Sequence, residues 1–168
     1  GLGVKLAKIP WLRQGYVIEH SRFSLGASIE SLLGYFYLQE AAAQLPVEVL
    51  EPLPGELVLD CCAAPGGKTT QIAQQMKNKG VLVALEKKSH RLASLRNNLE
   101  RIGVTNALVY HLDALKVGKL GLQFDKVLLD APCSGNFAGD QEWFAKRTIE
   151  EIRKSAQFQR NLIKSALS

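Results

Sequence analysis

Short apolar runs alternate with helical stripes along most of the chain. The apolar runs occupy residues 57–61, 81–86, 107–111 and 125–130, and turn residues or polar positions bound each of them. Runs of this length that are apolar at consecutive positions are typical of strands buried on both faces of a parallel sheet. Together with the helices between them, they predict an α/β fold built on a doubly wound, mostly parallel sheet.

Helical periodicity separates the expected strands. Residues 71–77 favour one helix after the first strand. A second helix is indicated by apolar residues three or four positions apart, namely Leu92, Leu95, Leu99 and Ile102. We expect Ser89 to cap this second helix and Gly103 to end it, because short polar side chains favour N-caps and glycine favours the left-handed C-terminal position.

The last segment carries the signature of a helix start. Thr148 and Glu151 have the spacing of a capping box, which predicts a helix that begins near residue 149. Its expected buried stripe consists of Ile149, Ile152, Ala156, Ile163 and Leu167. No strand-like run follows before Ser168, whereas open sheets of this kind normally continue, so we expect the sheet to be incomplete at the C-terminus.

The first fifty residues differ from the rest. Residues 1–27 show no sustained period, and the apolar spacing that follows predicts a helix over about 28–45. Two prolines and a glycine over residues 52–55 then break the chain before the first strand. The expected organisation is therefore a helical or irregular N-terminal extension over residues 1–50 and an α/β domain over residues 51–168.

Composition narrows the class of protein. A chain of 168 residues with 46% hydrophobic residues is long enough for one domain with a buried core. Its formal net charge of +5 suits a nucleic-acid partner. Cys61, Cys62 and Cys133 lack the spacing of a disulfide framework or a zinc site, and no apolar run is long enough to span a membrane. We therefore expect a cytoplasmic protein without a metal centre.

A glycine turn connects the first strand to the first helix of the sheet. Residues 60–69 read Asp-Cys-Cys-Ala-Ala-Pro-Gly-Gly-Lys-Thr. A turn in this position presents backbone N–H groups to an anion or to a nucleoside cofactor, and Gly66 and Gly67 permit close approach of a ligand. Two other interpretations stay open: a P-loop, although Cys62 replaces its first glycine, and a tight turn that binds nothing.

A carboxylate stands at the end of each of the four expected strands: Asp60, Glu86, Asp113 and Asp130. The carboxyl ends of parallel strands meet at one edge of a sheet, where open α/β folds bind ligands, so we expect all four to line one crevice. Glu86 is a candidate for accepting hydrogen bonds from a ribose diol, and Asp113 for bonding an adenine amino group. The alternative for Glu86 is a solvated loop carboxylate beside two lysines.

Cys133 follows the fourth strand in the segment Asp-Ala-Pro-Cys-Ser-Gly, residues 130–135. A thiol in a glycine-containing loop at a strand end is a candidate nucleophile or acid–base group if a nearby cation lowers its pKa. Lys68, in the glycine turn, is the expected cation. Cys133, Asp130 and Lys68 are therefore the candidate catalytic residues.

In these motifs the chain resembles the catalytic core of the RNA cytosine-carbon-5 methyltransferases, the family of the bacterial ribosomal and eukaryotic Nop2/Sun enzymes. The matching segments are residues 62–69 and 130–135, with weaker matches at residues 34–40 and 96–104. The resemblance implies a Rossmann-like fold of the class I methyltransferase type that binds S-adenosylmethionine and methylates cytosine in tRNA or rRNA. The cofactor-binding residues that it implies are Cys62, Ala63, Ala64, Pro65, Gly66, Gly67, Lys68, Glu86, Arg91, Asp113 and Asp130.

The resemblance also implies a role for several of these residues. Glu86 would bind the ribose and Asp113 would lie near the adenine. Asp130 would lie between the cofactor and the target base, and Arg91 would lie near the cofactor. The family uses two cysteines on the base: one, in a Thr-Cys pair, attacks carbon 6, and the other, which matches Cys133, assists release of the product.

This chain contains no Thr-Cys pair. The simpler account is that the sequence is a fragment that lacks the attacking cysteine. In the other account Cys133 itself attacks the base, as a Pro-Cys cysteine does in DNA cytosine methyltransferases. Both accounts stay open here.

Basic and aromatic residues near the two ends are candidates for guiding RNA. The basic residues are Lys5, Lys8, Arg13, Arg22, Lys146, Arg147, Arg153, Lys154, Arg160 and Lys164, and the aromatic ones are Trp11, Trp143 and Phe144. Alternatively, the basic residues belong to a solvated helix face and the aromatic residues belong to the core. The alternative function is a non-catalytic RNA-binding or scaffold module with a vestigial cofactor turn.

Overall fold

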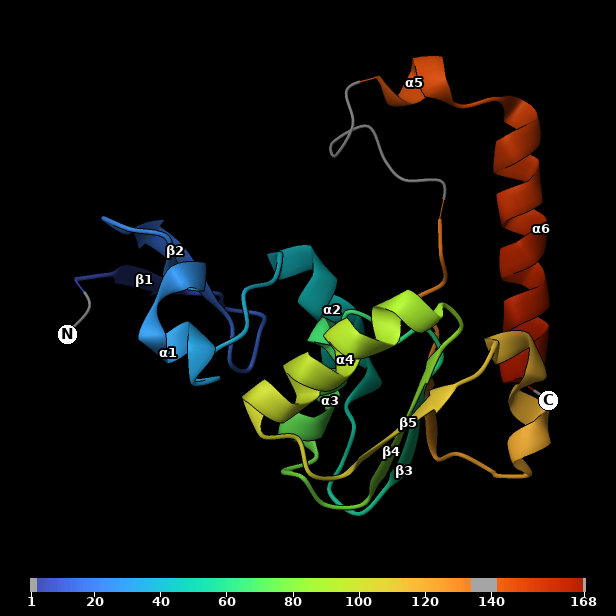
Figure 1. The fold of residues 1–168 in the computed structure, drawn as a ribbon, viewed down its shortest axis with the longest axis horizontal. Coiled ribbons are helices and arrows are strands. Elements are labelled where there is room, and N and C mark those ends of the chain that lie inside the picture. Colours follow the sequence, from blue (N-terminus) through green and yellow to red (C-terminus); the bar gives the residue numbers. More distant parts are fainter. Residues whose placement is uncertain (1–2, 134–141, 168) are drawn as a thin grey trace.

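The computed structural model describes residues 3–133 and 142–167 (Figure 1). Its centre is a sheet of four parallel strands in the order β5-β4-β3-β6. The strands are β3 (Leu57–Asp60), β4 (Val81–Glu86), β5 (Ala107–His111) and β6 (Lys126–Leu128). This confirms the doubly wound parallel sheet, because the apolar runs of the sequence lie on strands that have layers on both sides.

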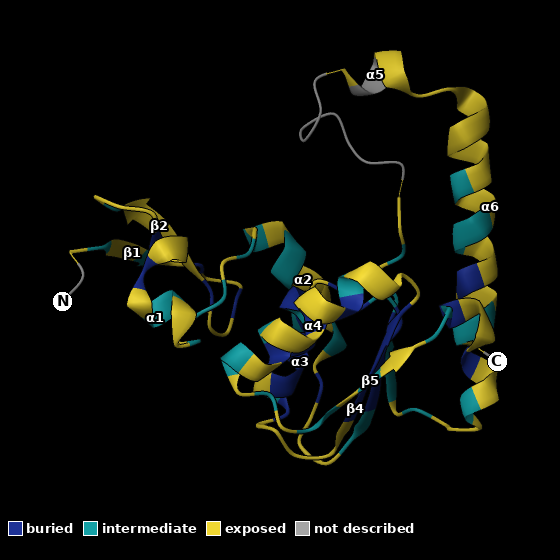
Figure 2. Ribbon diagram, viewed as in Figure 1, coloured by how far each residue is buried: buried dark blue, intermediate teal, exposed yellow. Residues whose placement is uncertain are grey.

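Helices cover one face of the sheet, and a second layer covers the other (Figure 1). The first layer contains α2 (Ala41–Leu50), α3 (Gly67–Gln75) and α4 (Ser89–Ile102), and the second contains the 3-10 helix η2 (Ala114–Leu120) and α6 (Ile149–Ala166). Neighbouring residues of β3 point to opposite faces of the sheet. Val58 packs with α2 and α3, whereas Leu59 packs with η2 and α6. Figure 2 shows the buried residues gathered on the strands and on the adjoining helix faces.

The ends of α4 agree in part with the expectation. Gly103 has a φ of 76° and ends the helix, as predicted. Ser89 is the first helical residue and not the cap; Lys88 precedes the helix, and its side chain makes no capping hydrogen bond. The helix expected over residues 71–77 begins earlier, at Gly67, directly from the glycine turn.

The single helix expected over residues 28–45 is wrong. The structure has a short helix, α1 (Ile29–Leu32), and then an extended segment before α2. Gly34 ends the first helix with a φ of 78°, and a Cβ at this position would overlap the backbone carbonyl oxygen of Arg101. The chain turns at Gly34 through a local glycine cap, in which the Tyr35 backbone N–H donates to Glu30 O, and the absence of a side chain lets the turn approach Arg101 of α4 closely.

Residues 1–27, expected to be irregular, contain a two-stranded antiparallel sheet of β1 (Lys5–Lys8) and β2 (Tyr16–His20), followed by the 3-10 helix η1 (Leu25–Ala27). Every residue of β2 is exposed. A strand without a buried face has no reason to alternate apolar and polar residues, so the sequence lacked the usual signal.

Helix α6 confirms the capping box and corrects the expected stripe. Thr148 accepts a hydrogen bond from the Glu151 backbone, and the Glu151 side chain accepts one from the Thr148 backbone. Two members of the expected stripe are largely exposed, Ile149 at 70% and Leu167 at 83%, whereas Leu162 is buried against η2. The N-terminal half of α6 stands away from the sheet, after the short helix α5 (Trp143–Lys146) (Figure 1).

Candidate functional site

The glycine turn is tied to both neighbouring strands. The backbone N–H of Cys61 donates to Leu128 O of β6 at 2.9 Å, and that of Ala63 donates to Leu85 O of β4 at 2.9 Å. Gly66, with a φ of 113°, then starts α3. The turn is thereby held at the carboxyl edge of the sheet, with the first N–H groups of a helix at its end.

Asp60 lies beneath this turn and not in a crevice, which corrects the expectation. Its side chain is buried, and its carboxylate accepts hydrogen bonds from Thr69 Oγ1 at 2.8 Å and from the Cys62 backbone at 3.3 Å. Burial raises the pKa of Asp60 to about 6, although the hydrogen bond from Thr69 opposes the rise. The carboxylate therefore braces the turn from below.

Glu86, at the end of β4, is buried, so the interpretation as a solvated loop carboxylate is wrong. Its Oε1 accepts a hydrogen bond from the Lys88 backbone at 2.7 Å, and its Oε2 lies 3.4 Å from Arg91 Nη1. The other arm of Arg91 donates to the carbonyl oxygen of Ala64 in the glycine turn. Arg91 thus links β4 to the turn, and Glu86 retains lone pairs for a further donor.

Asp113 lies just beyond β5. It pairs with Lys87 at 2.7 Å and caps η2 by accepting a hydrogen bond from the Leu115 backbone at 3.1 Å. Although burial tends to raise the pKa of Asp113, the hydrogen bonds from Lys87 and Leu115 hold it below its usual value.

The two family-like motifs meet through an ion pair. Lys68 Nζ, from the glycine turn, lies 2.8 Å from Asp130 Oδ2, just beyond β6. Cys133 is exposed three residues further on, and Ser134 and Gly135 lie outside the described residues. Lys68 therefore pairs with Asp130, and its expected role as the cation near Cys133 stays a prediction.

The two thiols of the glycine turn have raised pKa values. Burial raises the pKa of Cys62 to about 12, and the negative charges of Asp60, Glu86, Asp130 and Asp113 add to the rise. The pKa of Cys61 is also raised to about 12, chiefly by burial, so neither thiol is a thiolate at neutral pH.

A pocket of about 250 Å³ opens beside the turn. Its lining comes from the glycine turn, from Asp130, and from the segment before α2 and the first turn of α2. The lining residues are Tyr37, Leu38, Gln39, Ala43, Cys62, Ala63, Ala64, Pro65, Gly67, Lys68 and Asp130. Glu86, Arg91 and Asp113 are not part of this lining. The pocket therefore joins the turn and the two candidate catalytic residues Lys68 and Asp130, and the nucleoside candidates lie outside it.

The site includes residues to which the sequence analysis assigned no role. A Cβ on Gly67 would lie 3.0 Å from a ring carbon of Tyr37 and 3.3 Å from Gln39 Oε1, so the glycine is packed closely against the segment before α2. From α4, Asn98 donates to the carbonyl oxygen of Pro65 at 2.9 Å, and Arg101 donates to Asn98 at 3.2 Å. The weaker family matches at residues 34–40 and 96–104 were the available signal.

All ten basic residues named as RNA candidates are exposed, and four of them form ion pairs with carboxylates among the residues that the structure describes. The side chains of Trp143 and Phe144 lie outside what the structure describes, and Trp11 is half-exposed. Across residues 3–133 and 142–167, no cluster of three His, Cys, Asp or Glu side chains is suited to a metal ion, and no helix is long and apolar enough to cross a membrane.

The chain is similar to known proteins. A family model described as 16S rRNA methyltransferase RsmB/F matches residues 47–168. The chain is 43% identical over 159 residues to the 28S rRNA (cytosine-C(5))-methyltransferase of Mus musculus, covering 94% of this chain and 20% of that protein. It is 41% identical over 134 residues to the tRNA (cytosine(72)-C(5))-methyltransferase of Pyrococcus horikoshii, covering 80% of this chain and 34% of that protein.

The fold also matches a solved structure. The crystal structure of a methyltransferase homolog protein from Pyrococcus horikoshii superposes with a TM-score of 0.88 and 39% identity, covering 98% of this chain and 52% of that chain. The chain thus spans between a fifth and about a half of the length of these relatives.

Proposed function

The chain belongs to the 16S rRNA methyltransferase RsmB/F family, and from this premise we propose that it is the cofactor-binding core of an S-adenosylmethionine-dependent RNA (cytosine-5-)-methyltransferase. The substrate class is tRNA or rRNA, and the proposed location is the cytoplasm. The observation that supports this most directly is the Lys68–Asp130 ion pair, which joins the glycine turn to the loop after β6 in the lining of one pocket. That arrangement places a carboxylate beside the N-terminal amides of a helix at one edge of a parallel sheet.

The residues present fit the cofactor. S-adenosylmethionine, when bound, supplies a methyl group on a positively charged sulfur, and carboxylates favour a cation nearby. The first N–H groups of α3 and the pocket beside the turn suit its polar end, and the buried Glu86 carboxylate suits a ribose diol. Arg91 positions Glu86 and the Ala64 carbonyl relative to each other.

The chain's own residues also suit the chemistry of the base. Carbon 5 of cytosine becomes nucleophilic only after a thiolate adds at carbon 6, and a base must later remove the carbon-5 proton so that the thiolate can leave. The raised pKa values of Cys61 and Cys62 make these thiols unsuited to act as the attacking thiolate. Cys133 is the remaining thiol of this chain. Asp130, oriented by Lys68, is proposed to contact the polar edge of an unstacked cytosine.

Isothermal titration calorimetry of this chain with S-adenosylmethionine tests the proposal. We expect saturable one-site binding and no binding of ATP with magnesium. Absence of heat at millimolar cofactor, together with tight salt-sensitive RNA binding, would favour the non-catalytic scaffold.

The role of Cys133 has a separate test. Methyl transfer from labelled cofactor to RNA is measured with this chain and with Cys133→Ala. Turnover that is abolished by the substitution identifies Cys133 as the attacking thiol. The role in product release is instead supported by RNA that remains covalently attached when Cys133→Ala is introduced into a protein that also carries the attacking cysteine.

A further inference from the structure

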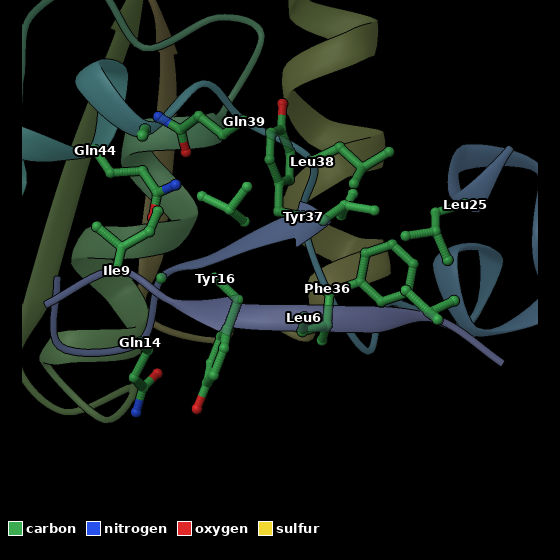
Figure 3. A pocket seen from close by; sticks show the side chains of 15 residues that line it. Leu6, Ile9, Gln14, Tyr16, Leu25, Phe36, Tyr37, Leu38, Gln39 and Gln44 are labelled. Carbon is green, nitrogen blue, oxygen red and sulfur yellow. The ribbon is translucent and has the colours of Figure 1, made fainter. Parts of the chain in front are cut away.

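A second site lies on the N-terminal side of the cofactor turn. Two adjoining hollows, of about 470 Å³ and about 820 Å³, extend between the β1–β2 sheet, the segment after α1 and the helices α2 and α3. Six residues line both hollows: Gln14, Tyr16, Phe36, Tyr37, Gln39 and Gln44. We call the two hollows together the N-terminal groove. Figure 3 shows the smaller one, with Phe36 and Leu25 toward one end and the three glutamines toward the other.

Aromatic rings in this groove are available to a ligand. Tyr16 is 55% exposed, and the larger hollow also includes Tyr35, which is 74% exposed. Lys8 Nζ lies 4.9 Å from the centre of the Tyr16 ring and is held by the carbonyl oxygens of Leu12 and Arg13. The Tyr16 ring is therefore in contact with an ammonium group, and the residue still keeps more than half of its surface exposed.

Amides supply the polar part of the lining. Gln39 is held by a hydrogen bond to Ala43 O at 3.1 Å. Within residues 3–133 and 142–167, the side-chain amides of Gln14 and Gln44 make no hydrogen bond. An amide both donates and accepts, so these two glutamines can pair with the edge of any nucleobase and select for none strongly.

The surroundings favour an anionic backbone. Residues 1–29 carry four cationic side chains and one carboxylate, Glu19, which pairs with Lys5. Lys77 lines the larger hollow, and in the described part of the chain neither Lys77 nor Lys8 forms an ion pair. Open aromatic faces combined with unpaired cations are typical of surfaces that bind single-stranded nucleic acid.

We propose that the N-terminal groove binds unpaired nucleotides of the RNA substrate, with one base stacked on Tyr16 and its edge facing Gln14 and Gln44. Tyr37 and Gln39 line this groove and the cofactor pocket alike, so RNA held here lies directly beside the pocket. The inference rests on the proposed function for the identity of RNA as the substrate, and it adds a place where the strand is held.

Anisotropy titration of a fluorescent, unstructured RNA of about twelve nucleotides tests the proposal. The variants are Tyr16→Leu and the matched control Tyr110→Leu, because Tyr110 is a half-exposed strand residue outside the groove. We expect Tyr16→Leu to weaken RNA binding about ten-fold, as for loss of one stacked base, and Tyr110→Leu to change it by less than about two-fold. Circular dichroism confirms that both variants fold.

A second measurement needs no substitution. In the wild-type chain, RNA that contains 4-thiouridine is crosslinked by light, and mass spectrometry locates the adducts. Adducts within residues 14–18 or 35–39 support the groove. Adducts confined to α6, or equal RNA affinity of Tyr16→Leu and the wild type, overturn it.

Two further readouts separate this proposal from others. Tyr16→Leu should leave the affinity for S-adenosylmethionine, measured by calorimetry, unchanged. If neither the wild type nor any variant binds the cofactor while Tyr16→Leu still weakens RNA binding, the proposed function fails and the groove proposal stands. Analytical ultracentrifugation tests whether the chain forms a dimer through the groove. If the wild type dimerises, Tyr16→Leu abolishes the dimer and RNA affinity is unchanged, the groove binds a second copy of the chain and the proposal is overturned.

Discussion

Lys68 Nζ lies 2.8 Å from Asp130 Oδ2, and this ion pair joins the glycine turn after β3 to the loop after β6. The two residues are 62 positions apart in the sequence and meet because β3 and β6 are neighbouring parallel strands. Asp130 is half-exposed and Lys68 is more buried, so the pair lies at the mouth of the pocket beside the turn.

Replacing the lysine should separate binding from stability. Lys68→Met removes the cation that orients Asp130, and we expect cofactor affinity in calorimetry to fall by about ten-fold. The melting temperature should change little, because an ion pair with an exposed partner contributes at most about 1 kcal/mol. The control is Lys154→Met, which removes an exposed pair with Glu150 and should change neither quantity. Unchanged cofactor affinity in Lys68→Met would remove Lys68 from the site.

Asp60 should make stability depend on pH. Its pKa is about 6 in the folded chain against an ordinary value of about 3.9, so between these values the folded state holds a proton that the unfolded chain has lost. The free energy of unfolding should therefore fall as the pH rises from about 4 to 6 and then level off. Relative to Asp60→Asn, the total fall should be on the order of 1–3 kcal/mol. Urea denaturation across this range measures the difference.

The hydroxyl of Thr69 provides a check on that interpretation. Its hydrogen bond to Asp60 favours the charged carboxylate, so Thr69→Val should raise the Asp60 pKa and extend the fall in stability to higher pH. Curves for the wild type and Asp60→Asn that stay parallel from pH 4 to 7 would show that Asp60 does not titrate in this window.

Glu86 should confer a preference for ribose over deoxyribose. We expect the wild type to bind S-adenosylhomocysteine about ten-fold more tightly than its 2′-deoxy analogue, and Glu86→Gln to lose most of this preference because an amide accepts the diol's hydrogen bonds less well. The ratio of the two affinities is the informative quantity, since the loss of the Arg91 contact would weaken both ligands together. A ratio that survives the substitution places the ribose elsewhere.

Gly34→Ala should destabilise the chain strongly. A Cβ here would overlap the Arg101 carbonyl oxygen, and the φ of 78° is unfavourable for alanine, so we expect a loss of about 2–4 kcal/mol in urea denaturation. Gly118→Ala is the matched control, because a Cβ at Gly118 has no atom within 4 Å. Similar stability of the two variants would contradict the close approach of α4 to Gly34.

Local patterns in the sequence were sufficient for the central sheet. The bounds of β4 and β5 match the apolar runs, and Gly103 ends α4 as its conformational freedom suggests. These features depend on neighbours a few positions apart. The strand-end positions of Asp60, Glu86 and Asp130 also follow from the sequence, whereas only Asp130 of these three lines the pocket beside the turn.

Long-range contacts decided what local patterns had left open or misplaced. Gly34 lies so close to the Arg101 backbone that no side chain fits there, and α6 buries Leu162 instead of its isoleucines because η2 packs against the side of the helix that carries Leu162. Asp60 and Asp130 look alike as strand-end aspartates, yet one is buried under the turn and the other pairs with Lys68 at the surface.

By itself, then, the sequence determined the parallel α/β sheet, the glycine turn and the family, since each depends on short-range order or on a contiguous motif. Tertiary structure alone decided which carboxylates face a pocket, which side of α6 is buried, and that the N-terminal groove lies beside the glycine turn. The physical reason is that burial of a side chain depends on the elements that pack over it, and those elements come from distant parts of the chain.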